Sequence, residues 1–156
     1  MACISRKEVI LEHPIAPCLH MGAIFLDATV EDVEGILGKP WKVMDVEGGT
    51  KMRIYPLHGA GEDKPYFAIT FRSGRVDAIQ LSGDETPDPY DFSSIRLGDP
   101  AEHVTGILGP ISDSKTVKDN GATLLSYQPF PISLEVKDKK VISVKIWHDA
   151  SEAAHR

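Results

Sequence analysis

Histidines and cysteines are residues that can bind metal ions or take part in catalysis, and their spacing in this chain indicates which of these roles is possible. His13 and His20 flank Cys18, a set that could bind a metal ion or activate a thiol nucleophile. The same segment contains Pro14 and Pro17, which favours the other interpretation, an extended lead-in without chemistry. No histidines follow a His-x-x-x-His pattern, and the two cysteines lack the four-ligand spacing of a zinc site. We therefore predict no metal site, no cofactor and two free thiols.

Other patterns that support catalysis are equally sparse. No serine stands in a Gly-x-Ser-x-Gly motif. The pair Gly59 and Gly61 has no third glycine and no following helix, so it predicts a hairpin loop and not a phosphate-binding loop. Paired acids such as Glu31 and Glu34 are expected at exposed positions, whereas a catalytic acid needs a pKa shifted by burial or a close partner. We predict no catalytic residue, and therefore a protein that is not an enzyme.

The composition bounds the class of protein. The 156 residues include 17 Lys and Arg against 23 Asp and Glu, for a net charge of −6, with 42% hydrophobic residues. These values favour one soluble globular unit, and the acidic balance argues against binding to nucleic acid. No apolar run approaches the ~20 residues of a membrane helix, and the first eight residues lack the apolar segment of a secretory signal. We expect a cytoplasmic protein without a membrane span.

An internal similarity organises the chain. Residues 24–38 align with residues 95–109 at a constant offset of 71 positions, and eight of the fifteen pairs are identical. Apolar residues in both segments recur at helical spacing, and Thr29 and Asp99 are good N-cap types. The pattern predicts one short helix in each half of the chain.

Each predicted helix carries two glycines. Gly38 and Gly109 stand where a left-handed residue ends a helix. Gly35 and Gly106 lie inside the helices, where glycine costs about 1 kcal/mol relative to alanine. We expect a close approach of helix to sheet at these two positions, although tolerance of a weak helix is the alternative.

Alternating apolar and polar residues predict four strands after each helix. We therefore predict an α+β fold of two tandem helix-plus-antiparallel-sheet repeats with about four strands each, in which the helix packs on one sheet face and the other face stays open. The predicted strands are 41–46, 51–55, 66–71, 76–81, 112–117, 123–127, 132–136 and 141–147. The expected organisation is an N-terminal lead-in over 1–21, repeat 1 over 22–82, an acidic proline-containing linker over 83–93, repeat 2 over 94–148 and a tail over 149–156.

The repeated pattern Ile-x-Leu, then Glu-x-Val-x-x-Ile-Leu-Gly, then a tyrosine and a strand pair, resembles the helix-plus-sheet repeat of the β-lactamase-inhibitory protein group. It is also similar to the small lipoprotein of the outer-membrane β-barrel assembly machine, and to uncharacterised cytoplasmic proteins encoded near bacterial polymorphic toxins. The resemblance implies a bacterial protein that binds another protein with the open sheet face, in the manner of an inhibitor or an immunity protein.

The expected binding surface follows from alternation along the strands. If Phe67, Ile69 and Leu134 face the helices, the opposite face carries an aromatic and basic set of the kind enriched in interfaces. This predicted surface consists of Arg53, Tyr55, Tyr66, Arg72, Tyr127, Lys145 and Trp147. The alternative is that the two half-sheets pack together, or that a second copy covers these rings. The linker acids Asp84, Glu85, Asp88 and Asp91 are expected to oppose a basic rim on the partner.

The sequence thus favours a non-enzymatic protein-binding module that inhibits or neutralises a cognate bacterial toxin or enzyme by occlusion. Two alternatives remain, a factor of cell-envelope assembly and a small-ligand-binding protein. The expected partner is a protein, with no nucleic acid and no membrane, and the chain itself is expected to be a monomer or a weak homodimer.

Overall fold

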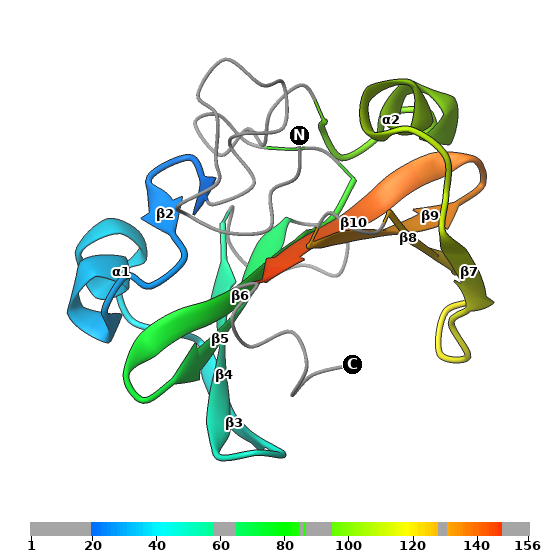
Figure 1. Ribbon diagram of the computed structural model, residues 1–156. Coiled ribbons are helices and arrows are strands. Elements are labelled where there is room, and N and C mark those ends of the chain that lie inside the picture. Colours follow the sequence, from blue (N-terminus) through cyan, green and yellow to red (C-terminus); the bar gives the residue numbers. More distant parts are fainter. Residues whose placement is uncertain (1–19, 58–64, 85, 87–94, 128–130, 148–156) are drawn as a thin grey trace.

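The computed structural model describes residues 20–57, 65–84, 86, 95–127 and 131–147. These residues are mostly strand, with two short helices (Figure 1). In chain order the elements are β1 (His20–Met21), β2 (Ile24–Phe25), α1 (Val30–Leu37), β3 (Lys42–Val46), β4 (Thr50–Pro56), β5 (Tyr66–Arg72), β6 (Arg75–Ser82), α2 (Ala101–Leu108), β7 (Asp113–Thr116), β8 (Thr123–Ser126), β9 (Ile132–Lys137) and β10 (Lys140–Trp147).

The first helix begins and ends as its sequence predicts. The Thr29 hydroxyl accepts a hydrogen bond from the Asp32 amide, and the Asp32 carboxylate accepts one from the Thr29 amide, each at 3.1 Å. This capping box satisfies two amides that the helix leaves without partners. Gly38 ends α1 with φ of +80°, a conformation that glycine adopts without steric cost.

The second helix begins differently from the prediction. Pro100, and not Asp99, is the N-cap of α2, and no side chain caps the helix. The Asp99 carboxylate instead accepts a hydrogen bond of 2.8 Å from the Arg96 amide, in the turn before the helix. That local bond competes for the oxygen that a cap would use. Gly109 ends α2 with φ of +91°, as predicted.

The expected close approach at the two internal glycines is wrong. A Cβ atom added to Gly35 or to Gly106 would meet nothing within 4 Å. Both residues lie on the exposed side of their helices. Neither position therefore needs glycine for packing, and each one weakens its helix without a compensating contact.

The strands form one continuous antiparallel sheet, and this overturns the predicted fold class of two helix-plus-sheet repeats. The eight-stranded sheet has the order β3-β4-β5-β6-β10-β9-β8-β7, while β1 and β2 pair separately. The two halves join at the centre, where β6 and β10 are antiparallel from Ser82 opposite Ser143 to Ala78 opposite Trp147. This pairing satisfies backbone groups that two separate sheets would leave at open edges.

The core lies on the side of the sheet that carries both helices. Phe67, Leu81, Val144 and Leu134 lie opposite one another on the four central strands and are all buried. Side chains from β1, β2, α1 and α2 cover this row and complete one hydrophobic cluster. The inward direction of Phe67 and Leu134 confirms the alternation predicted for β5 and β9.

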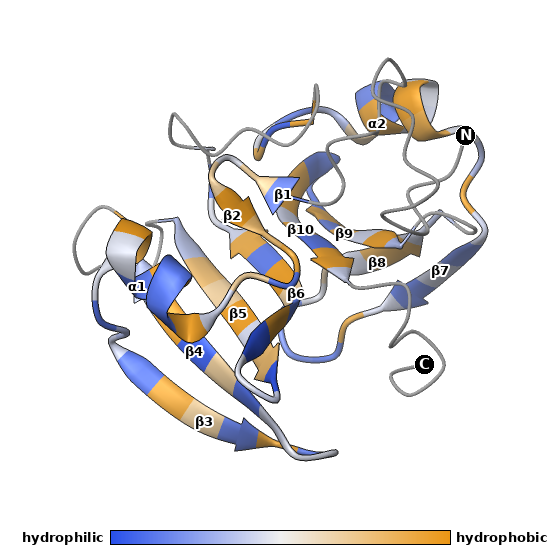
Figure 2. Cartoon of the chain, turned by 60° about the vertical axis from the view of Figure 1, so that its left-hand side comes forward, coloured by the Kyte–Doolittle hydropathy of each residue, from blue (hydrophilic) through white to orange (hydrophobic). Residues whose placement is uncertain are grey.

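The opposite side of the sheet carries neither helix, and we call it the open face. Figure 1 shows the outer strands β3 and β7 descending on either side of the central β6–β10 pair, so that the open face is concave. Hydrophilic residues recur along the edge strands, whereas β5 is mostly hydrophobic (Figure 2). Charged edge strands discourage unwanted pairing with other sheets.

Neither helix in the described part of the chain has the length and apolar character needed to cross a membrane.

Candidate binding site on the open sheet face

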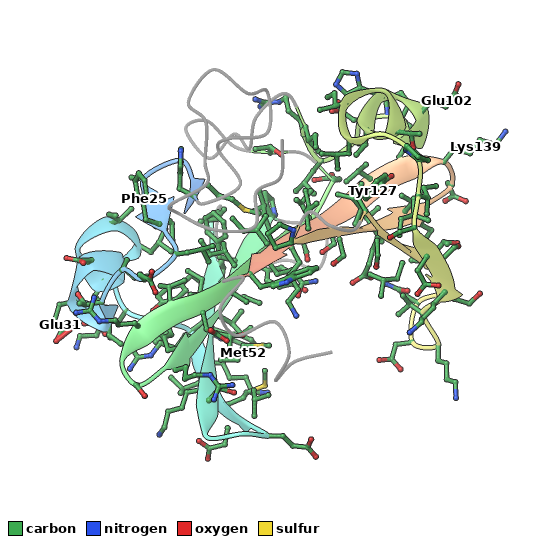
Figure 3. All side chains as sticks on the ribbon, viewed as in Figure 1. Phe25, Glu31, Met52, Glu102, Tyr127 and Lys139 are labelled. Atoms are coloured by element: carbon green, nitrogen blue, oxygen red, sulfur yellow. The ribbon has the colours of Figure 1, made fainter. Side chains whose placement is uncertain are left out.

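Strand register divides the predicted binding residues between the two faces. Arg53 lies opposite Ile69, and Tyr55 lies opposite Phe67, so both residues share the core face with those apolar partners. Tyr127 follows Leu125 by two positions and is on the same side (Figure 3). The expectation that these three residues lie on the open face is therefore wrong.

The two tyrosines are part of the core. Tyr55 and Tyr127 are each only 1% exposed. The Tyr127 hydroxyl lies 3.4 Å from the Thr105 hydroxyl of α2, whereas the Tyr55 hydroxyl has no hydrogen-bond partner among the described residues. Burial raises the pKa of the Tyr55 phenol above its usual value, and the nearby Arg53 guanidinium opposes that effect.

Arg53 is held under the first helix. Its guanidinium donates to the Glu34 carboxylate of α1 at 3.0 Å and lies 5.5 Å from the centre of the Phe71 ring. The ion pair and the cation–π contact explain why a cation occupies the helix side of β4. A partner on the open face could not reach this side chain.

Four predicted residues do lie on the open face. Tyr66 and Arg72 alternate with the buried residues of β5, and Lys145 and Trp147 alternate with those of β10. Arg72 is the last residue of β5, where it donates to the Gly48 carbonyl at 3.1 Å and lies 3.8 Å from the Asp77 carboxylate. Of the predicted linker acids, Asp84 is exposed. Glu85, Asp88 and Asp91 lie outside the described residues.

The centre of the open face is hollowed where the two halves of the sheet meet. A cleft of about 420 Å³ is lined by Tyr66, Gln80, Ser82, Gly83, Asp84, Asn120, Glu135, Ile142 and Ser143. A smaller hollow of about 210 Å³ adjoins it, shares Gln80, Glu135 and Ser143, and adds Lys145. We call these two connected hollows the central cleft. Tyr66, Asp84 and Lys145 are the predicted residues that the structure brings together here.

Strand register explains the position of the cleft. Tyr66, Ser82, Ser143 and Glu135 lie directly opposite one another across β5, β6, β10 and β9. Neighbouring strands are about 4.8 Å apart, so this row spans roughly 14 Å. Small serine side chains occupy its middle, between the larger Tyr66 and Glu135, and this difference in size accounts for the hollow.

Hydrogen bonds join the polar side chains of the cleft. The Gln80 amide donates to the Ser143 hydroxyl at 2.8 Å and to the Glu135 carboxylate at 3.4 Å. The Ser82 hydroxyl donates to Ser143 at 3.0 Å, and the Asn120 amide donates to Glu135 at 3.2 Å. The network connects β6, β9 and β10, and such a connected network orients its members.

Sequence analysis missed Gln80, Ser143 and Glu135. Each of them alternates with buried apolar residues of its strand, and so do other polar residues of the same strands, so alternation does not single them out. Their convergence depends on the pairing of β6 with β10, whose partners are about sixty positions apart in the chain. No pattern within a single strand reveals such a pairing.

The described residues contain no cluster of three or more His, Cys, Asp or Glu side chains that could hold a metal ion. His13 and Cys18 lie outside the described residues, whereas His20 begins β1 and its ring stacks on that of Phe25 with the ring centres 4.5 Å apart. A metal or thiol role for that set is therefore untested.

Neither a protein-family model nor a curated protein sequence matches the chain. Several solved structures share its fold. A DUF4309-family protein, YjgB, from Bacillus subtilis subsp. subtilis str. 168 has a TM-score of 0.55 and 16% identity, over 90% of this chain and 96% of that protein. A cysteine-rich secretory protein from Staphylococcus aureus subsp. aureus Mu50 has a TM-score of 0.53 and 14% identity, over 82% of this chain. The chain spans only 44% of that second protein.

A more distant structure belongs to a proposed β-lactamase inhibitor protein from Streptococcus mutans. Its TM-score is 0.31 with 13% identity, over 75% of this chain and 80% of that one. It agrees in part with the resemblance that the sequence predicted, but a likeness this low carries no argument about function. The two closer likenesses, below 25% identity, show the fold alone.

Proposed function

We propose that this chain is a non-enzymatic protein-binding module whose partner covers the open face of the sheet. The observation that carries the proposal is the arrangement of that face, which is concave, is free of both helices and has a polar cleft at its centre. An antiparallel sheet that buries one face in its own core leaves the other face accessible to solvent, where a partner could bind.

The composition of the open face supports a protein partner. Tyr66 is 36% exposed, and Trp147, Met52 and Lys145 are half-buried on the same face. Met52 precedes the core-facing Arg53 on β4 and lies opposite Thr70, so alternation places it on the open face. Aromatic residues and methionine are enriched in protein interfaces, and a half-buried aromatic ring beside polar groups is typical of an energetic hot spot.

The size of the face also fits. Seven strand spacings of about 4.8 Å give roughly 34 Å across the sheet, and six residues of about 3.3 Å give roughly 20 Å along it. The resulting area of roughly 700 Å² is close to the ~800 Å² that each partner contributes to a standard interface. The open face is therefore large enough to hold a folded protein.

We further propose what binding does to the partner: the chain covers the partner's active site and so inhibits it. An inhibitor, or a cytoplasmic immunity protein against a bacterial toxin, would act in this way. A concave surface can cover a convex catalytic rim, and the net charge of −6 would speed association with a basic enzyme. The cytoplasmic location belongs to this proposal.

Site-specific photo-crosslinking tests the binding face. A photoreactive phenylalanine analogue replaces Tyr66 on the open face or, as a matched control, Phe25, which is 43% exposed on the helix side. In extracts of the native host, the probe at position 66 should give one discrete adduct that excess unlabelled chain suppresses. An adduct of equal strength at both positions, or none that is suppressed, would refute the proposed face.

The captured protein then tests inhibition. Once purified, it should form a stoichiometric complex with the chain, and the double variant Tyr66→Ala with Lys145→Ala should lose that complex while unfolding at the wild-type urea concentration. Addition of the chain should abolish the enzymatic or toxic activity of the partner. A complex that leaves the activity intact would refute occlusion but retain binding.

A further inference from the structure

Glu135 is a charged group at one end of the row of side chains that lines the cleft, and no cation balances its charge within the described part of the chain. Among the described residues, its carboxylate accepts from two neutral amides, those of Gln80 at 3.4 Å and Asn120 at 3.2 Å. Within the described residues no lysine or arginine lies within ion-pair distance of it. Neutral donors hold a carboxylate in place but supply much less electrostatic stabilisation than a cation does.

Among the described residues, the charged groups that line the larger hollow have the same sign. They are Asp84 and Glu135, and Tyr66 adds a phenol. Lys145 lines the smaller hollow together with Glu135 and Gln80, and it is engaged in a further interaction. The larger hollow therefore offers an environment that favours a positively charged group.

The buried serines provide a second and separate indication of a ligand. Ser143 and Ser82 are 3% and 9% exposed and line the hollow. Ser143 accepts from the Gln80 amide, and a single bond joins the two hydroxyls. Because Ser82 is the donor of that bond, the hydrogen of the Ser143 hydroxyl has no acceptor within the described part of the chain. The cleft thus presents a buried donor beside its carboxylates, and a ligand with an acceptor atom would satisfy it.

We infer that the central cleft receives a basic side chain of the partner protein, with its guanidinium or ammonium group on Glu135 and an adjacent backbone carbonyl that accepts from the Ser143 hydroxyl. The inference rests on the proposed protein-binding function and names the chemistry that the partner must present. Arginine fits best, because its planar group can bind both carboxylate oxygens at once. The volume of about 420 Å³ lies within the range of sites that enclose small groups.

A titration of the full chain with blocked amino acids tests the inference without the partner. Acetyl-arginine amide imitates an arginine within a polypeptide, and acetyl-citrulline amide is its neutral counterpart of the same shape. In nitrogen-15 NMR spectra, the arginine compound should shift the side-chain amide of Gln80 and the backbone amide of Ser143. The citrulline compound should leave both signals in place. Equal shifts with the two compounds, or none with arginine, would overturn the inference.

Two variants check that Glu135 carries the effect. Glu135→Gln retains an oxygen that can accept from Asn120 but removes the charge, and it should weaken the arginine compound at least about tenfold. Glu102→Gln removes an exposed charge on α2 (Figure 3) and should change nothing. Unchanged binding to Glu135→Gln would overturn the assignment. Free arginine that binds tenfold more tightly than the blocked form would also overturn it, because the occupant would then be an amino acid and not a protein side chain.

The outcomes separate this inference from the proposed function. A suppressible crosslink at position 66 together with a failed arginine titration would overturn the cleft assignment alone. A successful titration without any crosslink would support the cleft and refute the protein-binding function.

Discussion

Replacement of Tyr55 by phenylalanine should stabilise the protein, which is the opposite of the usual effect of a core substitution. The phenol is 1% exposed, and its hydroxyl has no hydrogen-bond partner among the described residues. A buried polar group without a partner costs about 1–3 kcal/mol of desolvation free energy. Phenylalanine keeps the ring and removes the hydroxyl. The nearby Arg53 guanidinium offsets part of the desolvation cost, so Tyr55→Phe should raise the free energy of unfolding by about 1 kcal/mol, the low end of that range.

The second core tyrosine provides the matched control. The Tyr127 hydroxyl lies 3.4 Å from the Thr105 hydroxyl, at the long limit of a hydrogen bond. Tyr127→Phe should therefore lower the free energy of unfolding by about 0.5–1 kcal/mol. Urea unfolding at pH 7, followed by circular dichroism, measures both variants. If Tyr55→Phe loses as much stability as Tyr127→Phe, the Tyr55 hydroxyl has a partner in solution and the reasoning fails.

The pH dependence of the same variant is a separate check. Burial raises the pKa of Tyr55 above 10, the usual value for tyrosine. The unfolded chain then ionises first as the pH rises through 10, so this residue lowers the free energy of unfolding from about pH 10 up to its folded pKa. Tyr55→Phe lacks this loss, and its stability advantage over the wild type should widen between pH 8 and pH 11. A constant or shrinking advantage would contradict the raised pKa.

Three further predictions concern the helices. Gly35→Ala and Gly106→Ala should each raise the free energy of unfolding by about 0.5–1 kcal/mol, because both positions are helical and open to solvent; a loss of stability in urea unfolding would mean that an unseen contact needs the glycine. Thr29→Ala should lower the free energy of unfolding by about 1 kcal/mol through loss of the capping box, and an unchanged urea midpoint would contradict that role. A double-mutant cycle on Arg53 and Glu34 should give a coupling of about 1 kcal/mol at low salt that decreases in 1 M NaCl; a coupling of zero would show that the ion pair contributes nothing to stability.

Local elements of this protein could be predicted well from local patterns. Thr29 and Gly38 delimit the first helix because capping and left-handed termination depend on side chains within one helical turn. The inward direction of Phe67 and Ile69 follows from period-two alternation of strongly apolar residues. In both cases the energies that decide the structure arise from residues close together in the chain.

Strand β4 shows where alternation misleads. Arg53 alternates with the apolar Met52 and Ile54, so the pattern predicts Arg53 on the open face. The structure places it on the core face, because β4 pairs with β5 in the register that sets Arg53 opposite Ile69. Contacts with Glu34 and Phe71 then stabilise the cation there. The register decided the face, and a shift of one residue would have reversed it.

The sequence by itself determined the two helices, the eight strands of the large sheet and the net acidic charge, because composition and short-range periodicity are properties of the chain alone. It did not predict the short strands β1 and β2. Only the tertiary structure decided that the strands form one sheet and that Tyr66, Gln80, Glu135 and Ser143 surround one cleft. The physical reason is the pairing of β6 with β10, which satisfies backbone groups far apart in the sequence and brings together side chains that no local pattern connects.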